Sequence, residues 1–325
     1  MNNPAAWFQF ALYLGALLLI TKPLGLHLVQ VLDGRGRTWL DRVVKPFERL
    51  TYRVCRIDPE QEQSWIGYTF ALLLFSAVGM LFTYVILRFQ DHLPLNPQNL
   101  PGLAPGLAFN TAASFTTNTN WQNYAGESTM SYFSQMVALT IHNFTSAATG
   151  IGIAAALVRG IARHTAKTIG NFWVDVVRLC YYLLAPLCVV FALFLVSQGV
   201  IQNFKAYTVA RTFEPHTIQV PITDDKGQPV PAPAGNTPVT VDQTVDTQTI
   251  VQGPMASQVA IKMLGTNGGG YVNANAAHPF ENPTPLSNFF QMLSIGAIGS
   301  ALTYYLGQTV KNRRHGFHVW GAMFF

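Results

Sequence analysis

The stretch from Leu264 to Pro283 reads LGTNGGGYVNANAAHPFENP. A Thr-Asn step runs into three consecutive glycines, inside a chain that is otherwise rich in long apolar segments. Glycine adopts backbone angles that other residues avoid, so such a segment can turn several carbonyl oxygens toward one point. Rings of backbone carbonyls that replace an ion's hydration shell select K⁺ in channels. A flexible glycine-rich linker has the same composition, so glycine content alone leaves both interpretations open.

An earlier segment has the same layout. Residues 105–122 read PGLAFNTAASFTTNTNWQ, and residues 254–271 read PMASQVAIKMLGTNGGGY. Proline opens each segment, and a Thr-Asn step begins at Thr117 and at Thr266. Because proline is favoured at the first helical position, each segment is predicted to be a short helix followed by an irregular loop. The negative end of each helix dipole would favour a cation in that loop, and two such units indicate an internal repeat.

The composition is that of a membrane protein. Half of the 325 residues are hydrophobic, only 11% are charged, and the mean hydropathy is +0.24. Few soluble domains combine such hydrophobicity with so little charge. The net charge is +5, but the basic residues do not form the cluster that nucleic-acid binding requires, so no nucleic-acid partner is expected. The three cysteines fit no metal motif.

Five apolar segments approach the roughly 20 residues needed to span a bilayer. They are residues 7–32, 65–87, 131–158, 179–201 and 287–310. A sixth begins at Phe317 and stops at Phe325, so the sequence is expected to be cut off inside a helix.

Basic residues predict the orientation. Of the 20 lysines and arginines, seven lie in residues 33–64, four in 159–178 and three in 311–314. These are alternate connections, which the positive-inside rule places in the cytoplasm. The N-terminus and both loops are then predicted to be outside.

The predicted fold is an all-α membrane protein with an extra N-terminal transmembrane helix and two helix–re-entrant pore loop–helix repeats. Non-helical backbone at membrane depth is tolerated only inside protein or beside a wet cavity, so the loops are either pore elements or surface loops. The expected regions are an N-terminal helix and cytoplasmic loop (1–64), a first repeat (65–158), a second repeat (159–310) with an extracytoplasmic insertion at about 204–253, and a final cytoplasmic loop and helix start (311–325). Short strands are expected in the insertion from Val239 onward.

Both loops offer neutral oxygen atoms. The first loop, residues 116–122, and the second loop, residues 265–270, contain Thr, Asn, Gln and Gly but no acid. Uncharged oxygens suit weakly hydrated K⁺, whereas Mg²⁺ and Ca²⁺ sites use carboxylates. Glu127 and Glu281 come after the loops and are expected to line an outer vestibule or to make hydrogen bonds. Trp121 is expected to brace the first loop or to lie at the membrane interface.

Other polar residues leave alternatives open. His142, within the third span, is either a functional residue or a partner in a helix–helix hydrogen bond. Lys262 could tie down the second short helix or repel cations. A membrane-embedded enzyme using Glu127, His142, His278 or Glu281 is a competing hypothesis, although these residues are expected to fall on different levels. The chain has no phosphate-binding GxxxxGK[ST] motif, so no ATP chemistry is expected on it.

The two loop motifs resemble a known family. TTNTNWQ at 116–122 and GTNGGGYVNANAAHPFENP at 265–283 are similar to the first and second filter segments of the potassium-transporting ATPase A chain, the K⁺-binding subunit of the bacterial Kdp pump. The similarity runs the whole length, including CRIDPEQEQSW before the second span.

This resemblance implies four repeats around a pseudo-fourfold axis, of which two are present here. It implies high-affinity K⁺ uptake across the bacterial inner membrane, with K⁺ as the transported substrate and no organic cofactor. It also implies a P-type ATPase B chain that hydrolyses ATP, a C chain and a small F chain as partners, so this chain is expected to be non-catalytic. The implied filter residues are Thr117, Asn118, Thr119, Gln122, Thr266, Asn267, Gly268 and Gly269.

A channel-like or Trk/Ktr-type K⁺ symport subunit is the alternative within the same superfamily. Such subunits share the repeat, but the NANAAHPFENP tail and the extra first helix disfavour this assignment.

Overall fold

The computed structural model describes residues 4–33, 38–119, 122–163, 165, 167–222 and 239–324. It contains two compact units, Met1–Phe204 with Gly253–Phe325, and Lys205–Gln252. The first unit is helical and carries both loops. The second is a separate strand pair.

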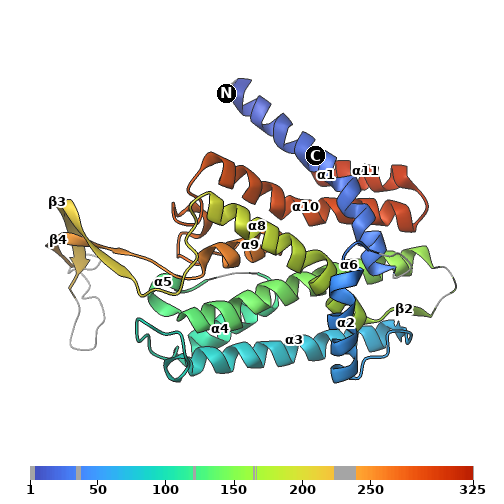
Figure 1. Ribbon diagram of the computed structural model, residues 1–325, viewed down its shortest axis with the longest axis horizontal. Helices are drawn as coiled ribbons and strands as arrows, with labels where there is room; N and C mark the ends of the chain where they lie inside the picture. The colour runs from blue at the N-terminus through green and yellow to red at the C-terminus, as the bar shows by residue number, and fades with distance from the viewer. Residues whose placement is uncertain are drawn as a thin grey trace. The chain divides into compact units, whose positions relative to one another are not determined.

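Five helices in the first unit are long and apolar enough to cross a membrane, as predicted. In Figure 1, α3, α6, α8 and α10 run across the view. The five are α1 (Pro4–Leu32), α3 (Trp65–Arg88), the π-helical turn η2 (Ser134–Thr140) continued by α6 (Ile141–Ala162), α7 (Phe172–Arg178) continued through η3 (Leu179–Leu184) into α8 (Ala185–Ser197), and α10 (Pro285–Thr309).

The fourth span begins earlier than predicted, at Phe172 rather than Leu179. Asn171 caps the helix, because its side-chain oxygen accepts two backbone N–H groups of the first turn. The sequence hides this start because Asp175 looks like a loop residue. In the structure Asp175 is buried and paired with Arg159 of α6, and such pairing is what allows a charge inside a helix bundle.

Asp175 and Arg159 join four helices at the predicted cytoplasmic end. The Asp175 carboxylate accepts hydrogen bonds from both terminal nitrogens of Arg159, at 2.7 and 2.9 Å, and from the Tyr68 hydroxyl of α3 at 3.0 Å. Arg159 also donates to the carbonyl of Leu32 at the end of α1 (2.9 Å). The main apolar cluster, which includes Leu28, lies among the same helices.

The predicted cytoplasmic segments contain regular structure. Helix α2 (Asp41–Cys55) places Glu48 inside the protein, where the carboxylate accepts from the Tyr182 hydroxyl at 2.7 Å and from Arg178 at 3.3 Å. Strands β1 (Gln63–Ser64) and β2 (Thr168–Gly170) form a short antiparallel pair. Helix α11 (Arg313–Phe324) comes after α10 and packs against it.

Two short helices lie between the long ones, as the proline signals predict. Helix α4 (Pro105–Thr116) packs against α3 and α6, and α9 (Met255–Leu264) packs against α8, α10 and α6. The remaining elements are the 3-10 turns η1 (Gln90–His92) and η4 (Asn275–Ala277) and the short helix α5 (Gly126–Thr129).

The second unit is an antiparallel hairpin of β3 (Thr208–Pro221) and β4 (Thr240–Ile250). Its register runs from Thr208 opposite Ile250 to Pro221 opposite Thr240, with one irregularity between Arg211 and His216. The strand predicted from Val239 onward is therefore confirmed.

Candidate functional site

Helix α4 ends in a Schellman turn at the first loop. The Asn118 N–H donates to the Phe115 carbonyl (3.2 Å), and the Thr119 N–H donates to the Ser114 carbonyl (3.0 Å). Asn118 has a φ of 58°. Left-handed backbone with these two bonds is the usual way in which a helix end satisfies its last carbonyls.

Helix α9 ends in the same way at the second loop. The Thr266 N–H donates to the Met263 carbonyl (3.2 Å), the Asn267 N–H donates to the Lys262 carbonyl (3.0 Å), and the φ of Thr266 is 57°. The hydrogen bonds therefore match Asn118 with Thr266. The two Thr-Asn steps in the sequence instead match Thr117 with Thr266. The alignment of the two segments by turn geometry therefore differs by one residue from their alignment by sequence.

The two loops meet through Asn118. Its side-chain nitrogen donates to the Gly265 carbonyl (3.3 Å), and its side-chain oxygen accepts from the amide of Asn267 (2.9 Å) and the hydroxyl of Ser146 on α6 (3.2 Å). Residues far apart in sequence are thus joined at two helix C-termini. This contact places the neutral oxygens of both loops in one region.

Gln122 provides a second link. Its amide nitrogen donates to the Gly270 carbonyl at 3.4 Å and to the Tyr124 hydroxyl at 3.1 Å. Burial raises the pKa of Tyr124, so this hydroxyl stays neutral. Asn120 and Trp121 lie outside the described residues, and the bracing role of Trp121 stays a prediction.

Threonine hydroxyls line the exposed side of the first loop. The hydroxyls of Thr117 and Thr119 are 2.7 Å apart, and that of Thr117 also bonds the Ala113 carbonyl (2.9 Å). Both residues are exposed. They therefore present uncharged oxygen atoms beside the end of α4.

Glycine is required in the second loop for two different reasons. Gly268 has a φ of 73°, a left-handed backbone that favours glycine, but a Cβ there would meet nothing within 4 Å. At Gly270 a Cβ would lie 2.3 Å from the Cα of Asn275, so close backbone approach excludes a side chain. The Gly269 N–H is held by the side chain of Asn267 at 3.2 Å.

The nearby acids bond the loop backbone. Glu127 accepts from the Asn273 N–H at 2.8 Å, and Glu281 accepts from the Val272 N–H at 2.6 Å. This confirms the hydrogen-bonding alternative for both. Within the described part of the chain no group of three or more His, Cys, Asp or Glu could hold a metal ion.

Sequence reasoning missed Gln135, which is buried in η2. Its amide nitrogen donates to the Tyr271 carbonyl (3.1 Å), and its oxygen accepts from Gln258 of α9 (2.6 Å). A glutamine within an apolar span was the available signal, because polar groups there usually bond another helix.

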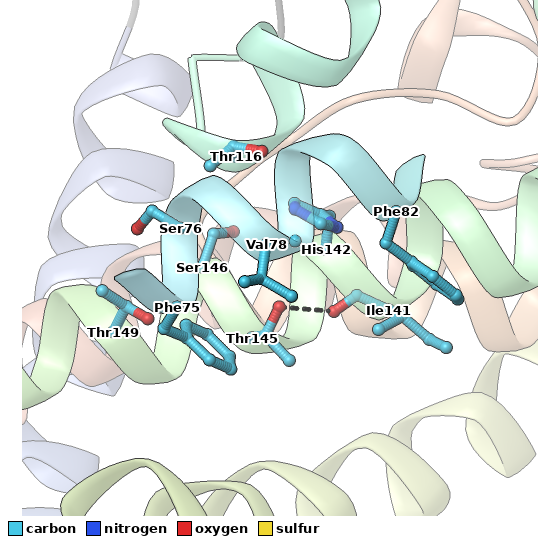
Figure 2. Close-up of a pocket in the computed structure, with 11 residues that line it drawn as sticks. Phe75, Ser76, Val78, Phe82, Thr116, Ile141, His142, Thr145, Ser146 and Thr149 are labelled. Carbon is cyan, nitrogen blue, oxygen red and sulfur yellow. Dashed lines mark hydrogen bonds between the residues drawn. The ribbon is translucent and has the colours of Figure 1, made fainter. Parts of the chain in front are cut away.

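His142 lies beside a pocket of about 240 Å³ between α3, α4 and α6. Figure 2 shows this pocket with Thr116, Thr145 and Ser146 among the surrounding side chains. The Nδ1 atom of His142 bonds the Thr83 hydroxyl at 3.0 Å, which is the helix–helix contact that one alternative expected.

The residues of the enzyme hypothesis have separate partners. His142 bonds Thr83, Glu127 bonds the backbone of Asn273, and Nδ1 of His278 accepts from the nearby Phe280 N–H. The structure therefore does not bring these groups together as an acid–base pair.

Comparison with known proteins decides the family. Residues 11–325 match the family model described as the potassium-transporting ATPase A subunit. The chain belongs to the potassium-transporting ATPase A subunit family. It is 54% identical over 318 residues to a potassium-transporting ATPase potassium-binding subunit from Koribacter versatilis, covering 98% of this chain and 51% of that relative. It is 51% identical over 323 residues to the protein of the same name from Dechloromonas aromatica, covering 99% of this chain and 53% of that one. The chain thus spans about half the length of these curated relatives of its family.

Proposed function

We propose that this chain forms part of a K⁺-selective pore, in the K⁺-binding and translocating subunit of an ATP-driven, high-affinity potassium uptake complex. The observation that carries this proposal is the contact of Asn118 with Asn267 and Gly265. It joins two loops that each extend from a helix C-terminus and offer neutral oxygens. A helix C-terminus is partially negative, so the pair stabilises a cation without a carboxylate.

The selectivity filter in this proposal takes oxygens of two kinds. The first loop contributes side chains, with hydroxyls from threonine and amides from Asn118 and Gln122. The second loop contributes backbone around Gly268 and Gly269, where a positive φ turns successive peptide groups. The proposed set is Thr117, Asn118, Thr119, Gln122, Thr266, Asn267, Gly268 and Gly269.

The loops are proposed to be re-entrant. Helices α4 and α9 contain 12 and 10 residues, too few to cross a bilayer, and each lies in sequence between two candidate spans. Non-helical backbone can lie at membrane depth when protein surrounds it. On this basis residues 65–158 and 159–310 form two repeats, residues 204–253 form an outer insertion, and 1–64 and 311–325 are the flanking regions.

The proposed setting is a bacterial inner membrane with the N-terminus outside. The basic-residue asymmetry supports this orientation. It can be checked with cysteines at exposed positions of a background lacking native cysteines: Asp246→Cys should react with an impermeant reagent from outside, and Arg49→Cys should not. The reverse pattern would overturn the orientation.

The proposed partners are those of the Kdp complex, a P-type ATPase B chain, a C chain and a small F chain. The name of the family, an A subunit of an ATPase, supports an assembly in which a partner chain hydrolyses ATP. This chain then binds and passes K⁺ without catalysing a reaction.

Ion uptake by the full-length protein tests the function. Cells that depend on it should accumulate K⁺ at concentrations where Na⁺ is not transported, and uptake should stop when ATP is depleted while the membrane potential is maintained. Uptake that tracks the ion gradient without ATP would favour the Trk/Ktr-type symport alternative. Absence of any K⁺ preference would contradict the pore itself.

A further inference from the structure

Lys262 and Glu281 form a buried ion pair behind the second loop. Lys262 lies in the last turn of α9, and Glu281 lies between η4 and α10. Both side chains are 0% exposed, and Nζ of the lysine is 3.8 Å from Oε2 of the glutamate. This separation is an ion-pair distance, longer than a direct charge-assisted hydrogen bond.

Each residue also holds one end of the second loop. The Lys262 carbonyl accepts the N–H groups of Asn267 (3.0 Å) and Gly268 (3.1 Å). The Glu281 carboxylate accepts the Val272 N–H at 2.6 Å. The segment that contains the three glycines is therefore hydrogen-bonded to Lys262 before it and to Glu281 after it, and the ion pair links these two residues to each other.

Glu281 is itself fixed to the next span. Its carbonyl accepts a hydrogen bond of 2.8 Å from the side chain of Gln291 on α10, which is also buried. These contacts thus connect the short helix, the second loop and a long helix. Movement of α10 relative to α9 would change the shape of the loop.

The first loop is supported differently. At the turn position that matches Lys262, α4 has Ser114, whose carbonyl accepts the Thr119 N–H (3.0 Å) and the Thr117 hydroxyl (3.2 Å) and whose side chain carries no charge. A buried charge is costly unless it is paired. An ion pair in a segment that otherwise offers neutral groups therefore points to a positional role rather than to ion binding.

We propose that Lys262 and Glu281 are a positioning pair that fixes the spacing of the second-loop oxygens and so sets the preference for K⁺ over Na⁺. This inference rests on the proposed pore function. Selection by cavity size and selection by the field of the oxygen dipoles both require that the oxygens be held in place. Opposite charges side by side hold them without adding net charge near the ion.

The test uses the full-length protein assembled in its complex. The variant Lys262→Met/Glu281→Gln removes both charges and keeps an oxygen that can accept the Val272 N–H. We expect the ratio of apparent affinities for K⁺ and Na⁺, measured from ion-stimulated ATPase activity, to fall by about tenfold, within the range of coupling between contacting residues. A wild-type ratio in the assembled variant would overturn the proposal.

A second buried pair provides the control. Glu48→Gln/Arg178→Met neutralises the pair that joins α2 to α7, far in sequence from both loops. It should lower the melting temperature and leave the affinity ratio unchanged; an equal fall of the ratio would mean that the effect is general destabilisation, and would overturn the positioning role. If the Lys262 and Glu281 double variant does not assemble, Glu281→Gln alone is judged by the same ratio.

The K⁺ preference of the wild-type protein distinguishes failure of this inference from failure of the function on which it rests. If wild-type protein shows no K⁺ preference, the proposed function fails and the inference falls with it. If wild-type protein prefers K⁺, and the double variant has the same preference, only the positioning role fails.

Discussion

The first and second loops extend from helices that end with the same two hydrogen bonds, yet the chain supports them by different means. The first loop presents exposed threonine hydroxyls and is held by amide contacts from Asn118 and Gln122. The second loop is mostly backbone, with a buried ion pair behind it. One kind of helix ending can therefore precede a loop rich in side-chain oxygens or a loop that is mostly backbone, depending on the residues just beyond the turn.

Residue choice at the turn itself also differs. Among the described residues with positive φ, Thr266 is the only β-branched one, and its counterpart is Asn118. Asparagine tolerates left-handed backbone, whereas a β-branched residue there is a genuine outlier. The second loop thus carries more backbone strain, and such strain is typical of functional sites.

The largest effect is expected from breaking the contact between the loops. Asn118→Leu keeps the approximate size of the side chain and removes three hydrogen bonds. With a total loss of about 2 kcal/mol, the apparent K⁺ affinity should fall roughly 30-fold in ion-stimulated ATPase assays of the full-length complex.

Ser146→Ala is the matched control for this variant. It removes only one of the three bonds and leaves the link between the loops, so its effect should be several times smaller. Equal losses in the two variants would mean that the bond to α6, and not the contact between the loops, matters.

A smaller effect is expected from relieving the strain in the second loop. Thr266→Gly should stabilise the folded state by about 1–2 kcal/mol, because it removes the cost of a left-handed backbone at a residue with a Cβ. It should also cost about 0.5–1 kcal/mol, because glycine gives the unfolded chain more conformational entropy. The melting temperature should rise slightly, while apparent K⁺ affinity falls because the hydroxyl is lost.

Arg56→Gly provides the comparison, because Arg56 also has a positive φ at a helix end but lies at α2. It should leave K⁺ affinity unchanged. A lower melting temperature for Thr266→Gly would show that the threonine is not strained.

The smallest effect is expected from a surface pair remote in sequence from either loop. The hydrogen bond from Arg163 holds the pKa of Glu62 below its usual value, with a further contribution from Thr168. A lowered carboxylate pKa stabilises the folded state above the unfolded pKa of about 4.5, and this contribution is lost as pH falls through the folded value. Because the pair is partly exposed, Glu62→Gln should cost less than about 1 kcal/mol at neutral pH. The difference in melting temperature from wild type should shrink toward pH 3, and a difference that grows there would contradict this assignment.

Much of the fold was predictable because its signals are local. Long apolar runs predicted the five spans, and the prolines at Pro105 and Pro254 predicted the two short helices. The hairpin strand beyond Val239 was predicted from alternation. Each of these signals lies within one segment and does not depend on a distant partner.

The features that were missed depend on distant partners. The start of the fourth span depends on Asp175 meeting Arg159, and the sequence did not identify Glu281 as the ion-pair partner of Lys262. Gln135 of η2 meets Gln258 of α9, far away in sequence. The alignment of the two loop segments was one residue off, because the sequence comparison matched identical residues whereas hydrogen bonds at the helix end define the turn.

Gly268→Asp tests whether the glycine run of the second loop faces the ion. Gly199→Asp is a matched control, because Gly199 also has a positive φ, open space around it and a place at the end of α8. K⁺- and Na⁺-stimulated ATPase activity of the full-length complex should be measured for both. We expect Gly268→Asp to weaken apparent K⁺ affinity greatly and to relax discrimination against Na⁺, while the complex still assembles and Gly199→Asp retains the wild-type curves. Wild-type curves for both ions in Gly268→Asp would mean that the glycine run is a linker and does not face the ion.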